Sequence, residues 1–246
     1  DGKNSTKYKN SFQAEMLSSF IIESSYPLMR EGINFNNYLT PQFSLRYSPN
    51  SMKDLSENDT RIDINNIFSL NRIASSDSVE SGQSLTMGIN YKKSRKTNYN
   101  INIDQEDAPP EDVFELSLAT VFRDEFNEDF PTSSSLGNKS SDVVGGIKIA
   151  PSNFFNTHYK FSLDNNLNQP KYHEISTDFI VNNFVTTFKY VEERDNIGNQ
   201  HYIQNTTTYD IDENNSFSFS TRKNKKIDLT EFYDLIYQYK NDCLTA

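Results

Sequence analysis

The feature that most constrains this chain is an alternation of apolar and polar residues, with a period of two, along most of its length. In one segment Leu85, Met87, Ile89 and Tyr91 are apolar or aromatic, and the residues between them are small or polar. Successive side chains of a β-strand point to opposite faces, so this pattern predicts strands with one apolar and one polar face. The pattern covers residues 12–22, 39–47, 85–91, 114–122, 143–149, 159–163, 175–181, 184–190, 203–211, 217–221 and 233–239.

The connectors between these segments alternate in length. Short connectors, rich in the Asn and Asp that tight turns favour, are 182–183, 212–215 and 240–242. Longer connectors are 123–142, 164–172, 192–200 and 222–230. Strands that cross a bilayer need about 9–11 residues, and short turns on one side with long loops on the other are typical of outer-membrane barrels. We therefore predict an all-β fold: an antiparallel transmembrane β-barrel, here a fragment of a large barrel that forms an open curved sheet.

Soluble β-proteins also alternate, and they remain alternatives at this point. A β-helix or a propeller would repeat at a fixed period, and the chain has no such repeat. A sandwich would bury its apolar face against a second sheet. The pattern alone leaves open an outer-membrane barrel, such as a porin or solute-transporting barrel, and a soluble secreted β-rich binding module.

Composition excludes several other classes. Only 35% of the 246 residues are hydrophobic, yet 13% are aromatic, which is too many for a disordered chain. The net charge of −10 argues against nucleic-acid binding, and the basic runs 92–96 and 222–226 are interpreted as solvated loop charge. No apolar run approaches the length of a membrane helix. The polar first residues, without a signal peptide, indicate an internal fragment.

The segment 61–83 is too long and irregular for a strand. It carries more apolar residues than a solvated loop normally does, so we expect it to be ordered and to pack into or over the barrel mouth on the extracellular side. The apolar residues expected to pack are Ile64, Ile67, Phe68, Leu70 and Ile73. Residues 99–103 form either a separate short strand or part of a periplasmic excursion, and only the second keeps 61–83 extracellular.

We predict no catalytic, cofactor-binding or metal-binding residues, and the chain is not expected to be an enzyme. His158, His173 and His201 are isolated, without a second ligand at metal spacing. Residues 210–221 imitate a calcium loop, but Asn215 stands where Gly is required and Thr221 where Glu is required. No phosphate-binding or nucleophile motif is present.

Three stretches resemble the LptD family of outer-membrane LPS-assembly proteins. Residues 61–82 contain an Asp-bearing segment, an Ile-Phe pair, an Asn-Arg pair and a Gly before a strand, as the family does. Residues 39–49 are similar to the preceding strand, and 233–244 to the late hairpin that carries a cysteine. The chain departs from the family at 74–75, where Gly is common, and in having a single cysteine where some members have a pair. Within the first stretch, Arg72 and Asp77 join the five apolar residues as the predicted lid.

The resemblance implies a bacterial outer-membrane location and a role in an LPS translocon that inserts lipopolysaccharide into the outer leaflet. Residues 1–246 would then be a partial barrel domain, without the N-terminal periplasmic jelly-roll domain and the terminal barrel strands. The implied partners are lipopolysaccharide, an LptE-like plug lipoprotein in the lumen, and a periplasmic LPS-bridge jelly-roll protein that docks on the missing N-terminal domain. No cofactor is implied.

The resemblance also assigns a role to the single cysteine, Cys243. In the family a cysteine at this turn forms a disulfide with the N-terminal domain, so its partner would lie outside this chain. The alternation of connectors places Cys243 at the periplasmic rim if short turns are periplasmic, and that compartment permits disulfides.

Overall fold

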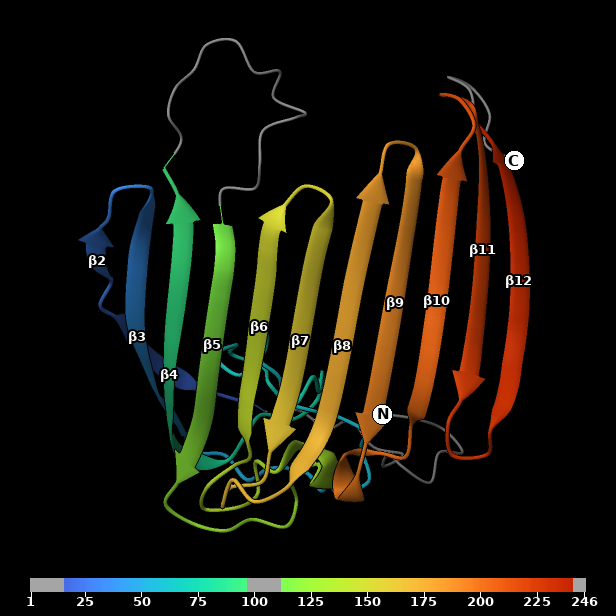
Figure 1. The fold of residues 1–246 in the computed structure, drawn as a ribbon. Coiled ribbons are helices and arrows are strands. Elements are labelled where there is room, and N and C mark those ends of the chain that lie inside the picture. The colour runs from blue at the N-terminus through green and yellow to red at the C-terminus, as the bar shows by residue number, and fades with distance from the viewer. Residues whose placement is uncertain (1–15, 97–111, 241–246) are drawn as a thin grey trace.

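The computed structural model describes residues 16–96 and 112–240, and these form a single antiparallel sheet of twelve strands (Figure 1). The strands follow one another across the sheet in chain order from β3 to β12, with β1 and β2 both paired to β3. Their bounds are β1 Phe20–Ser25, β2 Leu28–Glu31, β3 Phe35–Ser48, β4 Gly82–Arg95, β5 Asp112–Arg123, β6 Val143–Ser152, β7 Phe155–Leu163, β8 Pro170–Val181, β9 Phe184–Glu193, β10 His201–Asp210, β11 Asn215–Asn224 and β12 Leu229–Tyr239. The only described helices are the short 3-10 turns η2 Thr132–Ser134 and η3 Asp195–Ile197. The predicted all-β antiparallel fold is confirmed, as one open sheet.

The alternation in the sequence becomes two chemically different faces. Met87 and Ile89 are exposed on one face, whereas Thr86, the residue before Met87, is buried on the other. The register carries this division across the sheet, since Thr86 lies opposite Ser44 on one side and Val121 on the other. We call the face with Met87 the outer face. It carries exposed apolar residues of nearly every strand, among them Phe43, Leu45, Met87, Ile89, Phe122, Ile149, Ile175, Phe179, Phe188, Ile203, Phe217, Phe219, Tyr233, Leu235 and Tyr237.

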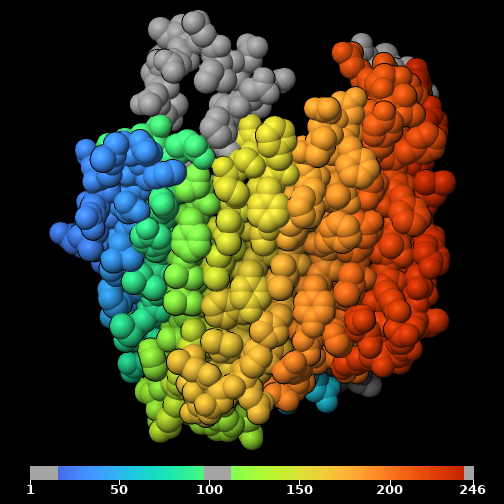
Figure 2. All heavy atoms as spheres, in the orientation of Figure 1, coloured from blue at the N-terminus to red at the C-terminus, as the bar shows by residue number. Residues whose placement is uncertain are grey.

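The hydrophobic core lies on the opposite, inner face, where loop residues pack against inward-facing residues of β5 and β6. It consists of Met52, Ile62, Ile67, Ile73, Ala119, Val121, Phe130, Leu136 and Val144. All described strands belong to one sheet, so no second sheet covers the outer face. Figure 2 shows the face turned away from these loops as a continuous wall of packed atoms. A soluble sandwich would bury this apolar face, so the architecture argues against that alternative.

From β5 to β11 the connectors separate by length to the two ends of the sheet (Figure 1). Short turns at 153–154, 182–183 and 211–214 lie at one end. Connectors 49–81, 124–142, 164–169, 194–200 and 225–228 lie at the other end. The predicted alternation therefore holds from β5 to β11, and the prediction at 222–230 is wrong, because the turn there is as short as 211–214.

The expected loop 222–230 is largely strand. Asn224 pairs with Leu229, which leaves a turn of only 225–228. The sequence predicts solvated loop charge for the basic residues there, but two of them have acidic partners in the hairpin. Arg222 contacts Glu231 at 2.7 Å, and Lys223 contacts Asp228 at 2.7 Å. Opposite charges therefore let the hairpin continue beyond the apolar alternation.

The first strand also differs from the expectation for 12–22. Strand β1 begins at Phe20 and ends before residues 26–27, which are not in a strand. An unpredicted strand, β2, follows, and both β1 and β2 pair with β3. Pro27 has no backbone N–H to donate, which explains the interruption. The predictions for residues 99–103 and Cys243 fall outside the described residues. No helix in the described part of the chain is both long and apolar enough to span a membrane.

Candidate functional site

Residues 49–81, which we call the inner loop, fold back over the inner face instead of extending away from the sheet (Figure 1). Ile67 and Ile73 are buried in the hydrophobic cluster together with Val121 and Val144 of the sheet. A solvated loop would leave these side chains in water, and burying each one contributes about 1.5–3 kcal/mol. The inner loop is therefore an ordered layer on the polar side of the sheet.

The predicted lid residues occupy distinct places in this layer. Ile67, Arg72 and Ile73 are fully buried, while Ile64 and Phe68 are partly buried against the same cluster. Leu70 is 57% exposed, and its backbone carbonyl instead accepts a hydrogen bond from Arg46. Asp77 pairs at the surface with Lys53 at 3.3 Å. The side chains of five of the seven residues thus contact the sheet or its core, whereas those of Leu70 and Asp77 do not.

Two glycines of the wall form close contacts with side chains of the loop, and sequence reasoning did not identify them. A Cβ atom at Gly88 would lie 2.7 Å from Cζ of Phe68, which is closer than such atoms approach. A Cβ atom at Gly146 would lie 3.3 Å from Cγ2 of Ile64. Glycine at these two inner-face positions allows the loop side chains to approach the backbone of the sheet.

The inner loop is joined to the wall by the fully buried guanidinium of Arg72. Its Nε donates to Oε1 of Glu80 at 2.8 Å, and its Nη2 donates to Oε2 at 2.7 Å. The same group donates to Thr86 Oγ1 at 2.8 Å and to Ser84 Oγ at 2.9 Å, both on β4. A bidentate, charge-assisted pair of this kind has one well-defined geometry, so it sets the position of the loop on the wall.

Two further arginines of the wall surround the same carboxylate. Arg46 of β3 and Arg123 of β5 both lie beside Ser84 of β4 in the register, and they approach Glu80 at 3.8 and 3.7 Å. One carboxylate cannot neutralise three guanidinium groups. The excess positive charge is met by backbone carbonyls of the loop, at 69 and 70 for Arg46 and at 81 for Arg123. We call Glu80 and these three arginines the arginine cluster.

Burial alone would raise the pKa of Glu80, but the charge and hydrogen bonds of Arg72, with the charges of Arg46 and Arg123, hold that pKa below its ordinary value. A carboxylate whose pKa is lowered by folding stabilises the folded state above its unfolded value of 4.5, and this contribution is lost as the pH falls through the lowered value. The cluster is therefore charged and intact at neutral pH.

This linkage gives an expected result for acid. Protection of the inner loop from hydrogen exchange should be constant from neutral pH to about the ordinary glutamate value, and should fall below it as Glu80 takes up a proton. Exchange measured by mass spectrometry on peptides covering 61–83 tests this. The Glu80→Gln variant should lack the acid transition, and an unchanged transition in that variant would assign it to another group.

A second loop, 124–142, holds the inner loop from its other side. The Leu55 amide donates to the carbonyl of Asp129 at 2.8 Å, and Ser133 Oγ donates to the carbonyl of Thr60 at 3.0 Å. Arg61 forms an ion pair of 2.5 Å with Glu193 at the end of β9. The long connectors therefore form one interlocked layer that spans several strands.

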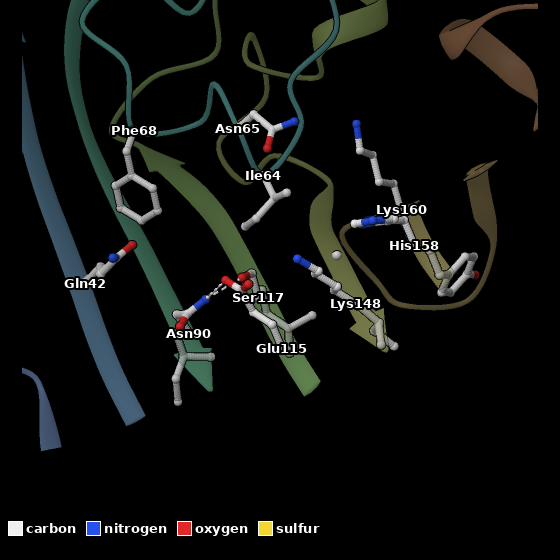
Figure 3. A pocket seen from close by; sticks show the side chains of 15 residues that line it. Gln42, Ile64, Asn65, Phe68, Asn90, Glu115, Ser117, Lys148, His158 and Lys160 are labelled. Atoms are coloured by element: carbon white, nitrogen blue, oxygen red, sulfur yellow. Dashed lines mark hydrogen bonds between the residues drawn. The ribbon is translucent and has the colours of Figure 1, made fainter. Parts of the chain in front are cut away.

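Between the inner loop and the wall lies a pocket of about 400 Å³. Ile64 and Phe68 cover it from the loop, and strands β3 to β7 supply its other side (Figure 3). Its wall is polar. Glu115, Lys148 and Lys160 supply charged groups there, and the other polar residues include His158, Gln42, Asn90 and Ser117.

The histidines do not converge. His158 lies on the inner face, with Nε2 3.0 Å from Nδ2 of Asn156. His173 and His201 lie on the outer face beside Tyr159 and Tyr190, respectively. Within residues 16–96 and 112–240, no group of three or more His, Cys, Asp or Glu side chains is arranged to hold a metal ion.

The chain matches a known protein family. The model of the family described as "LptD: LPS transport system D" matches residues 1–224 of the chain. No curated protein matches it. The match covers the whole inner loop, the arginine cluster and the pocket.

Proposed function

Because the chain belongs to the LptD family, a family of outer-membrane LPS transport proteins, we propose that its sheet is part of a translocon barrel that inserts lipopolysaccharide into the outer leaflet. In this proposal the inner face lines the lumen, and the inner loop is a lid across it. The observation that carries the proposal is a polar inner face covered by a buried loop, on a single sheet whose opposite face is apolar and uncovered.

The proposed lumen requires a closed barrel. The sheet is open, with β12 at one edge and β1 and β2 at the other. Unpaired backbone groups at a sheet edge are costly in lipid, so further strands must pair with these edges in the membrane. We propose that this chain is a partial barrel domain and that these strands belong to the same full-length protein.

The orientation follows from the connectors. Outer-membrane barrels have short periplasmic turns and longer extracellular loops. The inner loop and the 124–142 loop emerge at the long-connector end, which we propose is extracellular. Strand β12 ends at the opposite end with Tyr239, and Cys243 is four residues further along the chain, so we propose that Cys243 forms its disulfide in the periplasm with the N-terminal domain.

The proposed partners follow from the family. An LptE-like plug lipoprotein would occupy the lumen beside the inner loop, and a periplasmic jelly-roll protein would deliver lipopolysaccharide through the N-terminal domain. The polar inner wall supports the first proposal, because a protein plug needs hydrogen-bonding partners there.

Locking the lid tests the proposed function. Ile64 and Gly146 are in contact, so cysteines at these two positions are suited to form a disulfide between loop and wall. If lipopolysaccharide passes beneath the inner loop, the oxidised Ile64→Cys/Gly146→Cys protein should export it several-fold more slowly, and a reductant should restore the rate. Surface lipopolysaccharide, measured by its modification in intact cells, gives the rate.

Each single-cysteine variant serves as the control, since it carries the same local change without the cross-link. Equal export by the oxidised and reduced double variant, with the disulfide demonstrated to have formed, would contradict the proposed role of the inner loop.

A further inference from the structure

The pocket beneath Ile64 and Phe68 combines cations with neutral hydrogen-bonding groups. Resting on the proposed function, we propose that it is a binding site for an anionic saccharide, with Lys148 and Lys160 holding a phosphate group and neighbouring amides and hydroxyls holding sugar hydroxyls. The site lies on the proposed path of lipopolysaccharide beneath the inner loop, and the proposal specifies which part of the lipopolysaccharide contacts this wall. It would bind the sugar headgroup and not the acyl chains.

The charge on Lys148 is the main evidence for an anion-binding site in this pocket. Lys148 lies between Glu115 on β5 and His158 on β7 in the register, and its side chain extends toward the space beneath Ile64 (Figure 3). Among the described residues it has no ion-pair partner within 4 Å. Lys148 interacts electrostatically with Asp112, but the Asp112 carboxylate already forms an ion pair with Lys92 at 3.3 Å. Lys148 is half-buried, and its ammonium group is available to an anion.

The second cation, Lys160, forms only a long ion pair within the protein. Lys160 lies 4.0 Å from Glu174, whereas Lys189 contacts that same carboxylate at 2.8 Å. Glu115, the carboxylate within the pocket, accepts a hydrogen bond of 2.8 Å from Asn90. The pocket thus carries two lysines against one carboxylate that is held by an amide, in a chain whose net charge is −10.

The remaining lining suits a sugar better than a hydrocarbon chain. Asn90 donates to both Glu115 and Ser117, so polar groups of β4 and β5 are already ordered at the base of the pocket. Ile64 and Phe68 supply an apolar cover. An acyl chain would displace water from Lys148 and Lys160 without giving their ammonium groups a partner, which is unfavourable. The volume of about 400 Å³ lies within the range of small-ligand pockets.

Calorimetric titration of the full-length protein, purified with its partner lipoprotein, tests the site. The probes are deacylated lipopolysaccharide that retains its phosphates, the same saccharide after enzymatic dephosphorylation, and inorganic phosphate. The Lys148→Gln/Lys160→Gln variant should bind the phosphorylated saccharide about 10- to 100-fold more weakly, because two charge-assisted hydrogen bonds are lost. The Lys139→Gln/Lys225→Gln variant removes the same charge from exposed loop positions and should bind as the wild type does.

A Lys148→Arg/Lys160→Arg variant, which keeps both charges, should retain most of the binding and so separates loss of charge from damage to the wall. A change in electrophoretic mobility on heating verifies barrel assembly in every variant. Equal binding of the phosphorylated and dephosphorylated saccharides, equal loss in both Gln variants, or equally tight binding of inorganic phosphate would overturn the proposal.

The proposed function and this site fail separately. If the variants bind normally and the 64–146 cross-link still slows export, only the saccharide site is wrong. If the Gln variant loses binding and the cross-link has no effect on export, the site stands and the lid does not.

Discussion

Replacing Glu80 with Gln should release the inner loop from the wall while the barrel still assembles. The substitution leaves Arg46, Arg72 and Arg123 buried around an uncharged group, and removing one partner of a buried ion pair typically costs about 3–5 kcal/mol. That penalty falls on loop docking, because hydrogen bonds between neighbouring strands do not involve the Glu80 side chain. We expect faster hydrogen exchange in 61–83 and greater sensitivity of cells to large antibiotics that the outer membrane normally excludes.

Asp77→Asn is the matched control for this variant. It makes the same acid-to-amide change in the same loop, but at an exposed ion pair with Lys53. Exposed pairs contribute about 0–1 kcal/mol, so exchange and permeability should remain close to those of the wild type. If Glu80→Gln leaves exchange in 61–83 unchanged, the arginine cluster does not hold the loop.

The second large effect is expected on the outer face of β11. Phe219 is exposed there near the middle of its strand, and its neighbour Ser220 faces inward against Thr206. An arginine that faces lipid near the middle of the membrane costs about 2–4 kcal/mol, so Phe219→Arg should markedly reduce assembled barrel. Ser220→Arg has the same charge at the same depth but faces the lumen, and it should assemble nearly normally.

Phe219→Ala separates loss of the ring from the cost of the charge, because it removes the ring contact with Tyr233 without adding an arginine. Assembly is measured as the fraction of protein whose electrophoretic mobility changes on heating. Similar losses for the two arginine variants would contradict the assignment of the faces.

The division into faces was predictable because it depends on a local property. Alternation at Leu85, Met87 and Ile89 places these side chains on one face whichever strands flank them. The limits of the strands were less predictable, since Arg222 and Lys223 extend β11 through partners that lie across a turn. The break between β1 and β2 had a visible signal in Pro27, which sequence reasoning did not use.

The burial of the inner loop was predictable in part. The density of apolar residues in 61–83 indicated a packed segment, but not which surface it packs against. The close contacts at Gly88 and Gly146 depend on how Phe68 and Ile64 approach the wall. A local sequence pattern does not contain that information. A signal was nevertheless present, because glycine interrupts two strands of otherwise regular alternation.

The arginine cluster was beyond sequence reasoning for a similar reason. Arg46 and Arg123 are far apart in the chain and lie on either side of Ser84 only through the register of three strands. Arg72 was included in the lid through the family resemblance, without a partner. Its partner, Glu80, lies in a loop where a carboxylate is ordinarily interpreted as solvated.

Site-specific photo-crosslinking in cells that export lipopolysaccharide tests the central claim most directly. Position 158 lies on the inner face beneath the lid, and position 42 lies on the same face at the opposite margin of the pocket, so a photoreactive amino acid is placed at each. We expect lipopolysaccharide adducts at both positions, and we expect them to disappear when delivery from the periplasm is stopped. Continued export without an adduct at any inner-face position would contradict the account, because lipopolysaccharide would then bypass this wall.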